Sequence, residues 1–398
     1  MIEERETIKK QCDEWLDSQM TDLWKLSRYI WENPEMAFEE HKACEAQCAY
    51  LEQAGFAVER QVGGLETAYT ATFISGTGKP VLAIAAEYDA LPIGHACGHN
   101  LIAASSVGAA VEIKKYLELT GGNATIRVVG TPAEESGGGK IILLKNGVFD
   151  GADAVFMMHP TSAPTRLAGA CMSGKQYTLT YTGASAHANS HPDNGINALS
   201  AASLFLSATG MLRQQFKGDA RLSAIITNGG IDRDLIPEKA EIVGAFSCFS
   251  VKDLEHYTEM IERCAKGCGD AMGCGTKIEI VEGYQGRVPN QVLSDLCKEE
   301  FRKLDELLLP GMPSDFGGED LGNVSQKIPI CNPYVTIFPD YKISNHTAQF
   351  RELAGSPAGE RCVRVTSKAI SRTLAEIVEN PSILAEAKAE LERRLEQQ

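Results

Sequence analysis

Residues 87–100 read Glu87-Tyr88-Asp89-Ala90-Leu91-Pro92-Ile93-Gly94-His95-Ala96-Cys97-Gly98-His99-Asn100. They follow Val81–Ala86, a short continuous apolar run that predicts a buried strand of a parallel sheet. They lead into Asn100–Leu119, which has the length and the apolar spacing of a helix. Cys97 and His99 are therefore expected at a strand-to-helix turn, where a helix N-terminus favours a thiolate. This junction is typical of an α/β fold.

Residue types that bind metals recur after later strand-like segments. Cys-x-His alone is a weak signal, because a buried thiol and a helix-capping histidine explain it equally well. Candidates that follow successive strands, however, lie at one edge of an α/β sheet, where such folds bind ligands. The further candidates are Glu134-Glu135 after Thr125–Gly130, His159 after Ala154–Met158, and His346 in the polar turn Ile343–Thr347.

Several motifs occur in the order found in one known family. They are Asp89-Ala90-Leu91-Pro92, His95-Ala96-Cys97-Gly98-His99-Asn100, Pro132-Ala133-Glu134-Glu135, His159, Asp320-Leu321-Gly322-Asn323-Val324-Ser325 and Asn345-His346-Thr347. With these motifs the chain resembles the M20 metallopeptidase and amidohydrolase family. It is most similar to the aminoacylase-like branch that includes aminobenzoyl-glutamate hydrolase, and the resemblance covers nearly the whole chain.

The resemblance implies two divalent metal ions per subunit. One thiolate, three imidazoles and one carboxylate suit Zn²⁺, and Mn²⁺, Co²⁺ and Ni²⁺ are compatible with the same donors. These five groups are sufficient for two ions if at least one of them bridges. The residues that the resemblance assigns as ligands are Cys97, His99, Glu135, His159 and His346.

Two further carboxylates have expected roles in catalysis. If Glu135 binds metal, Glu134 points the other way and can take a proton from water and return it to the leaving amine, which is also the role that the resemblance implies. Asp89 is expected to hold a ligand imidazole in one tautomer. The alternatives are a solvated helix start for the glutamate pair and a plain turn residue for Asp89.

Glu87 departs from the family pattern. Other M20 branches carry a metal-binding histidine at this position, two residues before Asp89. We expect Cys97 to provide the missing ligand. His95 is expected to form hydrogen bonds within the loop. The alternative is that His95 binds a metal ion.

Composition restricts the class of protein and its partners. The chain has 398 residues, of which 43% are hydrophobic, so it can bury a large core and form two domains. Its net charge of −15 argues against nucleic acid or an anionic membrane as a partner. The charged start Met1–Glu6 does not resemble a secretory signal, and no apolar run approaches the length of a membrane span. We therefore expect a cytoplasmic protein.

The chain contains twelve cysteines. In a reducing compartment most of them are expected to be core or surface thiols, with Cys97 as the exception. Cys264, Cys268 and Cys274 loosely resemble a metal cluster. Because the first two have the i, i+4 spacing of a helix, packing is the favoured interpretation.

The pattern changes after Met172. The predicted elements follow the order β-α-β-β-α-β, which is the ferredoxin-like arrangement. They are strand Gln176–Tyr181, helix Asn194–Leu212, strands Leu222–Ile226 and Ala240–Phe246, helix Val251–Cys268 and strand Lys277–Val281. We therefore predict a discontinuous α/β catalytic, metal-binding domain of residues 1–172 and 287–398. Residues 173–286 are predicted to be an inserted α+β lid and dimerisation domain.

The inserted segment contains Gly183-Ala184-Ser185-Ala186-His187-Ala188. The resemblance implies that His187 reaches across a homodimer and donates a hydrogen bond to the oxyanion of the tetrahedral intermediate. A preorganised donor of this kind is worth about 10²–10³ in rate. The alternative is a strand-end histidine without such a role. His191 lies nearby. A role at the site and the capping of the next helix are equally compatible with its position.

Two positions in the insertion differ from the pattern for binding a substrate carboxylate. Family members commonly use an asparagine before an Ile-Pro pair and an arginine at the end of the next strand. This chain has Asp234 and Ser247 there, which removes attraction for an anion. We expect a substrate that lacks a carboxylate at this position or carries a neutral or cationic group. Arg233 or Arg287 could instead provide a displaced cation.

These features predict a metal-dependent amidohydrolase that cleaves a small-molecule amide or peptide bond with metal-activated water. Its substrate is expected to be an N-acyl amino acid, a dipeptide or a related amide. Within enzymes, the alternative is a substrate without a carboxylate that releases an aryl or cationic amine. Outside enzymes, the alternatives are a catalytically silent binding protein for small molecules and a redox or zinc-storage protein built on the cysteines.

Overall fold

The strand Val81–Ala86 (β3) lies inside a six-stranded sheet of the computed structural model, which describes residues 2–338 and 342–397. The strand order is β1-β2-β4-β3-β5-β12. All six residues of β3 are buried, as expected for an apolar strand covered on both faces. The strands β4, β5 and β12 run parallel to β3, whereas β2 runs antiparallel to its two neighbours, β1 and β4. Their bounds are β1 Ala57–Arg60, β2 Tyr69–Ser75, β4 Ala124–Gly130, β5 Ala154–Phe156 and β12 Ile330–Cys331.

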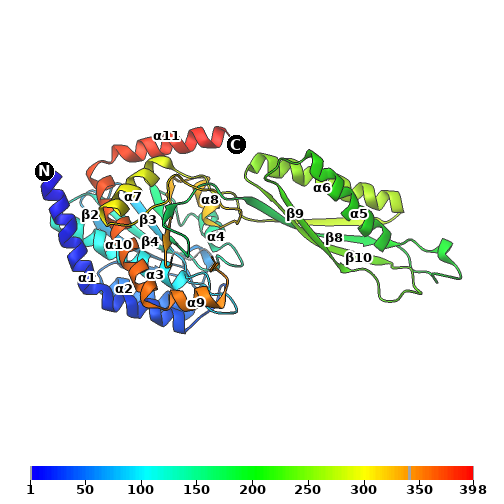
Figure 1. Ribbon diagram of the computed structural model, residues 1–398, viewed down its shortest axis with the longest axis horizontal. Coiled ribbons are helices and arrows are strands. Elements are labelled where there is room, and N and C mark those ends of the chain that lie inside the picture. The colour runs from blue at the N-terminus through cyan, green and yellow to red at the C-terminus, as the bar shows by residue number, and fades with distance from the viewer. Residues whose placement is uncertain (1, 339–341, 398) are drawn as a thin grey trace. The chain divides into compact units, whose positions relative to one another are not determined.

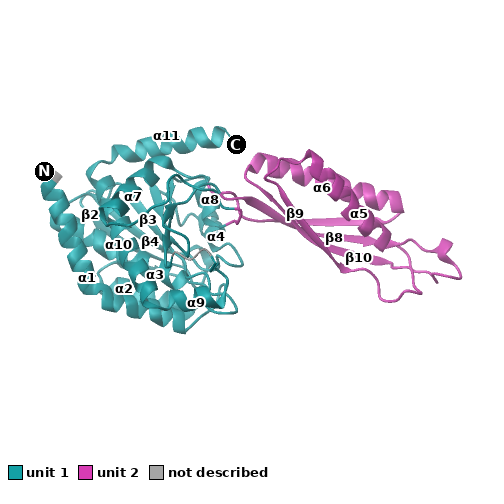
Figure 2. Ribbon diagram, viewed as in Figure 1, with its two compact units in different colours: residues 1–170, 288–315, 319–397 teal, residues 171–287, 316–318, 398 magenta. Residues whose placement is uncertain are grey.

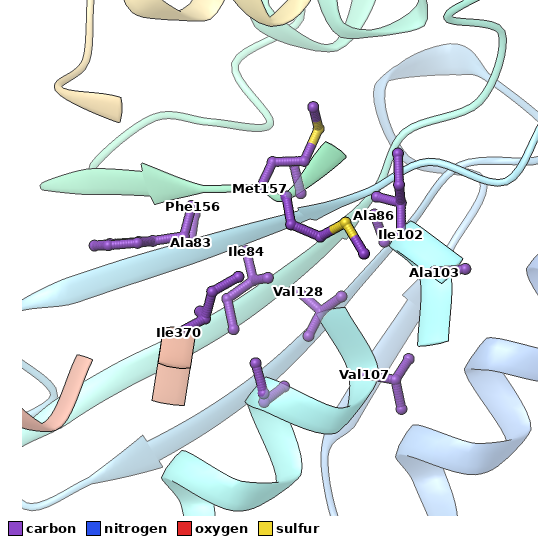
Figure 3. Packing of buried hydrophobic residues seen from close by; sticks show 14 of the residues in the cluster. Ala83, Ile84, Ala86, Ile102, Ala103, Val107, Val128, Phe156, Met157 and Ile370 are labelled. Atoms are coloured by element: carbon purple, nitrogen blue, oxygen red, sulfur yellow. The ribbon is translucent and has the colours of Figure 1, made fainter. Parts of the chain in front are cut away.

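Helix α3 (His99–Thr120) packs between the sheet and two other helices, α1 (Ile2–Glu32) and α10 (Pro357–Glu379). Figure 3 shows Ile84 and Val128 of the sheet in the same cluster as Ile370 of α10. At Gly108 of α3 an added Cβ would lie 2.3 Å from the hydroxyl of a serine on α10, so glycine allows the two helices to approach closely.

The loops at the carboxyl ends of β3, β4 and β5 share one edge of the sheet. The chain passes from β3 to β4 through α3, and then to β5 on the other side of β3. Such a reversal opens a crevice above the carboxyl ends of the strands. The α/β class predicted for this part of the chain is confirmed. The remaining helices of this part are α2 His41–Gln53, α4 Gly139–Lys145, α7 Gln291–Lys303, α8 Leu321–Ser325, α9 Ala348–Ala354 and α11 Ser382–Glu396.

The chain forms two compact units (Figures 1 and 2). Unit 1 contains the residues up to Ala170 together with Val288–Asp315 and Glu319–Gln397, and unit 2 contains Cys171–Arg287 and Phe316–Gly318. The sequence predicts a catalytic domain of residues 1–172 and 287–398 and an inserted domain of residues 173–286. No helix within the described residues is long and apolar enough to cross a bilayer.

Unit 2 is a four-stranded antiparallel sheet with two helices on one face (Figure 1). Its strand order is β11-β8-β10-β9, and the elements follow one another as β-α-β-β-α-β. Cys268 and Cys274 belong to its apolar core, in agreement with the packing interpretation. The elements are β8 Ser173–Thr182, α5 Ala198–Leu212, β9 Arg221–Asn228, β10 Lys239–Cys248, α6 Val251–Met272 and β11 Gly275–Glu282.

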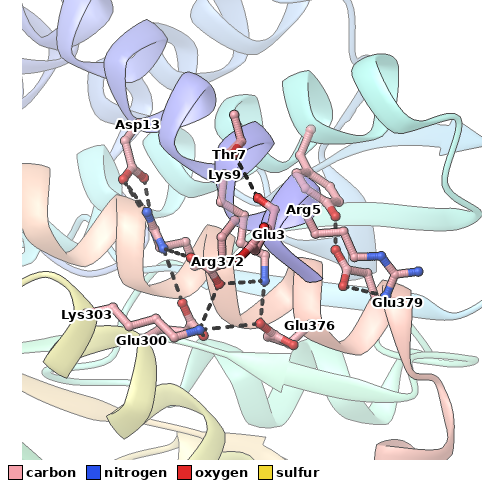
Figure 4. Close-up of polar contacts among 12 residues, drawn as sticks. Glu3, Arg5, Thr7, Lys9, Asp13, Glu300, Lys303, Arg372, Glu376 and Glu379 are labelled. Carbon is pink, nitrogen blue, oxygen red and sulfur yellow. Dashed lines mark hydrogen bonds and ion pairs between the residues drawn. The ribbon is translucent and has the colours of Figure 1, made fainter. Parts of the chain in front are cut away.

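Charged side chains join α1 to α7 and α10 in unit 1 (Figure 4). The guanidinium of Arg372, 4% exposed, lies 2.7 Å from Asp13 and 3.5 Å from Glu300, which is itself 1% exposed. Lys303 pairs with Glu300 at 2.7 Å and with Glu6 at 2.9 Å. Because cations already neutralise these carboxylates, the cluster has a structural role and is not a metal site.

Replacing Arg372 by alanine is expected to lower the free energy of unfolding by about 3–5 kcal/mol, because it leaves the buried carboxylate of Asp13 without its counter-charge. Denaturation by urea measures the change. The control is Arg364→Ala, which removes an ion pair between side chains of α10 and α1 that are 39% and 40% exposed. Its effect should stay below about 1 kcal/mol. Equal losses in the two variants would contradict the proposed role of burial.

Candidate metal centre

The loop after β3 places Cys97 and His99 at the start of α3. Gly98 between them has φ 79°, and an added Cβ would lie 2.7 Å from the ring of Pro160. Only glycine accommodates both the left-handed backbone and this close approach. Cys97 and His99 are 5% and 1% exposed, so both side chains are held inside the protein.

Asp89 joins two of the candidate ligands. Its Oδ1 lies 2.8 Å from Nδ1 of His99, and its Oδ2 accepts a hydrogen bond of 2.8 Å from the backbone N–H of Glu135. Burial alone would raise the pKa of Asp89, but the charge of His99 and these hydrogen bonds hold it below its usual value. An ionised Asp89 fixes the proton of His99 on Nδ1 and leaves Nε2 available for a metal.

His159 faces Cys97 across the crevice. Its Nε2 lies 3.4 Å from Sγ of Cys97, and its Nδ1 is 2.8 Å from the carbonyl oxygen of Pro160. The ring stacks on Tyr334 at 5.0 Å between centroids. Burial would raise the pKa of the Cys97 thiol, but the charges of His159 and His99 lower it to about 6. A thiolate is the form that binds metals.

The prediction that Ala154–Met158 forms one continuous strand before His159 is wrong. The strand β5 stops at Phe156, and His159 begins a new strand, β6 (His159–Thr161). This strand pairs in parallel with β13 (Pro333–Thr336), in a three-stranded sheet completed by β7 (Arg166–Leu167). The chain therefore passes from the six-stranded sheet into the three-stranded sheet between Phe156 and His159.

His346 approaches from the other end of the chain. Its Nε2 lies 3.4 Å from Oε1 of Glu135, and its backbone N–H donates to the carbonyl of Ala96 at 2.8 Å. The residue has φ 61°, which is uncommon for a side chain other than glycine. The neighbouring Asn345 amide lies 3.8 Å from Sγ of Cys97. These contacts hold the loop that contains His346 in a position where its imidazole lies beside the carboxylate of Glu135.

The five predicted ligands form two groups that share Cys97. Cys97, His99 and His159 make one group and Cys97, Glu135 and His346 the other, with donor atoms within 4.8 Å of one another in each. Nε2 of His99 and Oε1 of Glu135 are buried and form no hydrogen bond with any described residue. Buried polar atoms normally have partners, so this donor set would fit two divalent cations. The ligand roles themselves stay predictions.

Glu134 lies on the same edge, 12% exposed, with Oε2 3.9 Å from Nε2 of His99. Burial raises its pKa well above the usual value, and the charges of Glu87 and Asp320 add to the effect. The alternative reading of the glutamate pair as a solvated helix start is wrong, because the helix α4 begins only at Gly139.

A buried lysine beside this group was missed by the sequence analysis. Nζ of Lys140 lies 2.5 Å from Oε1 of Glu87 and 2.7 Å from Oδ1 of Asp320. The other oxygen of Glu87 has no hydrogen bond among the described residues and lies 3.4 Å from Nε2 of His99. Glu87, His99 and Glu134 therefore form a third group of closely spaced donors. The departure from the family pattern at Glu87 was the only signal that the sequence offered.

His95 does not join these groups within the described residues, although it is 1% exposed. Burial lowers its pKa to about 3, so its imidazole is neutral. Neither ring nitrogen forms a side-chain hydrogen bond within the described residues.

The substrate-binding residues predicted in unit 2 fall into two places. His187 is exposed in a loop beyond the end of β8, and the carbonyl of Asp234 accepts a hydrogen bond from the neighbouring Ala188 at 2.9 Å. Ser247 lies near the other end of β8, opposite Gly174. With roughly 3.4 Å per residue, the two places are separated by roughly 25 Å along the strands. One copy of unit 2 therefore does not bring all three residues together.

The two arginines considered as displaced cations differ in exposure. Arg233 is 91% exposed and lies 3.6 Å from the carboxylate of its neighbour Asp234. Arg287 is 1% exposed. Ser247 lines a cavity of about 720 Å³ in unit 2, and neither arginine is among its lining residues.

Known proteins match this chain over most of its length. A family model described as peptidase family M20/M25/M40 matches residues 83–372. The Xaa-Arg dipeptidase of Mus musculus is 37% identical over 99% of this chain and 94% of its own length. One of the subunits of p-aminobenzoyl-glutamate hydrolase from Escherichia coli K12 is 31% identical over 72% of this chain and 63% of its own. A solved Bacillus subtilis structure, described as a dinuclear metal binding peptidase from the M20 family, shares the fold with a TM-score of 0.74 at 22% identity, covering 91% and 99% of the two chains.

Replacing Asp89 by asparagine is expected to weaken metal binding by about 10–100-fold, because the amide no longer fixes His99 and Glu135 as the carboxylate does. Competition with a chelator, followed by metal analysis, measures the change. Asp150→Asn, on the surface after α4, is the control. Unchanged metal affinity in Asp89→Asn would show that Asp89 does not orient a ligand.

Proposed function

The chain belongs to the peptidase family M20/M25/M40, and we propose that this metal-dependent hydrolase of C–N bonds cleaves a dipeptide, an N-acyl amino acid or a related small amide. One observation carries the proposal. Two groups of donors share Cys97, and Glu134 lies on the same edge of the sheet. The relative named Xaa-Arg dipeptidase makes dipeptides that end in arginine the first substrates to test.

The residues of this chain divide the work of hydrolysis. Two divalent ions, when bound, polarise the scissile carbonyl and lower the pKa of a water molecule. Glu134 takes a proton from that water and returns it to the leaving amine. Glu134 holds that proton between the two steps. Cys97, His99, Glu135, His159 and His346 serve as ligands, and their one thiolate and three imidazoles favour Zn²⁺ over Mn²⁺, Co²⁺ or Ni²⁺.

The insertion of a second copy of the chain also contributes a residue to the active site. His187 and Ser247 lie at opposite ends of the same sheet, so one substrate cannot contact both residues of one copy. We assign His187 to the active site of the partner subunit in a homodimer formed through unit 2, where it donates to the oxyanion.

A catalytically silent binding protein is the second candidate function. It would keep the same crevice but would not need Glu134 to be a carboxylate. The relatives named as a dipeptidase and as a hydrolase favour catalysis over silent binding, and Glu134, the candidate base, lies beside the donor groups.

We also propose a cytoplasmic location. All twelve cysteines carry free thiols in the described part of the chain. Free thiols in this number suit a reducing compartment.

Replacing Glu134 by glutamine is expected to lower kcat by about 10²–10⁴-fold, because the amide cannot carry the proton. Metal content should not change. Release of arginine from alanyl-arginine, after loading with Zn²⁺ or Mn²⁺, measures the effect. Glu118→Gln, 44% exposed on α3, is the control. Wild-type turnover in the Glu134→Gln variant would exclude Glu134 as the base, and no turnover by any loaded form would favour the binding protein.

Mixing two inactive variants tests the dimer. His187→Ala is expected to lose about 10²–10³ in kcat. A mixed dimer of His187→Ala with Glu134→Gln has one site in which both groups are intact. Activity should therefore return after the two proteins are unfolded and refolded together, in proportion to the mixed dimers formed. If activity stays at the level of the separate variants, His187 does not act across a dimer.

A further inference from the structure

The backbone N–H groups on both sides of Glu134 are bound by buried carboxylates. The N–H of Glu135 donates to Asp89, which lies in the loop after β3. The N–H of Ala133 donates to Oε1 of Glu40 at 2.9 Å. Glu40 directly precedes α2 and is 0% exposed. The candidate base therefore lies between two amides that two different parts of the chain hold in place.

Ala133 has a strained backbone. Its φ of 61° lies in the left-handed region, which residues other than glycine rarely adopt. The residue is also buried, so its N–H needs a partner inside the protein. Conformations of this kind persist only where the surrounding structure holds them, and they cluster at functional sites. The hydrogen bond from Ala133 to Glu40 is such a contact, one residue before the candidate base.

The same oxygen of Glu40 also organises the turn before α2. Oε1 accepts a second hydrogen bond, of 3.0 Å, from the N–H of Phe38, which has φ 66°. One oxygen thus binds two residues with left-handed backbone. The ring of Phe38 packs against the loop after β4, since a Cβ added at Gly137 would lie 2.5 Å from a ring carbon. The turn before α2 therefore contacts the loop that carries Glu134 at two places.

The second oxygen of Glu40 is bound as well. Oε2 accepts a hydrogen bond of 2.9 Å from the hydroxyl of Thr67, whose carbonyl accepts one of 2.5 Å from the hydroxyl of Tyr88. Thr67 and Tyr88 are both buried. Burial of a carboxylate is costly unless hydrogen bonds compensate for the lost water. With both oxygens bound, the side chain of Glu40 provides a fixed acceptor for Ala133.

We propose that Glu40 is a positioning residue for Glu134. It binds the N–H of Ala133 and so maintains the left-handed backbone that sets the direction of the next side chain. The side chain of Glu40 forms no hydrogen bond with a candidate metal ligand in the described part of the chain, so it acts through this backbone. The inference rests on the proposed role of Glu134 as the base.

Two substitutions of Glu40 distinguish the hydrogen bond from the rest of the side chain. Glu40→Ala is expected to lower kcat for alanyl-arginine by about 10- to 100-fold, because a small displacement of a catalytic group has an effect of this size. KM should change less than about twofold, since Glu40 does not bind the substrate. Glu40→Gln should keep the wild-type kcat, because its oxygen can accept from Ala133 and its amide can donate to Thr67. Metal content should match the wild type in both variants, because Asp89 still holds its partners.

Glycine at position 133 and a matched control complete the comparison. Because glycine adopts left-handed backbone without the steric cost of alanine, adding Ala133→Gly to Glu40→Ala should raise kcat by about fivefold or more. Glu40→Met, which removes the acceptor but keeps most of the side-chain volume, is used if Glu40→Ala does not fold. The control is Glu35→Ala, which removes a carboxylate that binds the backbone of Lys42 and Ala43 in α2. Its kcat should not change.

Hydrogen exchange tests the contact independently of catalysis. Exchange of the Ala133 amide, followed by mass spectrometry of the peptide that contains it, should be faster in Glu40→Ala and unchanged in Glu40→Gln. If no loaded form hydrolyses any substrate, the proposed function fails, and this difference still supports the contact between Glu40 and the loop. Wild-type kcat in Glu40→Ala, equal losses in Glu40→Ala and Glu40→Gln, or equal exchange in all forms would overturn the inference.

Discussion

The carboxylate of Asp89 is the contact on which the metal centre depends. One oxygen holds His99, from the start of α3, and the other holds the backbone of Glu135, from the loop after β4. Two adjacent strands and one helix therefore meet at a single buried side chain. Cys97 precedes His99 by only two residues. The contact between Asp89 and His99 therefore also restricts the position of the Cys97 sulfur, which belongs to both donor groups.

The sequence was informative where function depends on residues close together in the chain. Val81–Ala86 is apolar at every position, so its burial and its place in the sheet were predictable, and so was the turn that carries Cys97 and His99. The sequence was not informative where interacting residues lie far apart in the chain. Lys140 meets Glu87 and Asp320, which are 53 and 180 positions away, and no local pattern marks such a triad. The break before His159 was also hidden, because Met157 and Met158 are as apolar as the strand that they follow.

Register explains why the substrate residues were harder to interpret than the metal ligands. When β10 is considered alone, Ser247 indicates that the cation of the family pattern is missing. The pairing of β10 with β9 puts Arg221 directly opposite, and only the sheet reveals that neighbour. The same register puts His187 and Asp234 beyond the far end of β8 and β10. A sheet thus separates residues that a list of motifs treats as one set, and it joins residues that no motif contains.

Unit 1 is assembled from chain segments on both sides of unit 2, and this has a consequence during synthesis. Unit 2 is nearly continuous from Cys171 to Arg287, so almost all of it has left the ribosome before the last ligand candidate, His346, is made. Domains fold as units once their chain is available. The nascent chain therefore carries a folded insertion, with Cys97, His99, Glu135 and His159 already made, before the set of candidate ligands is complete. The set is complete only once His346 has been made, with 52 of the 398 residues still to follow.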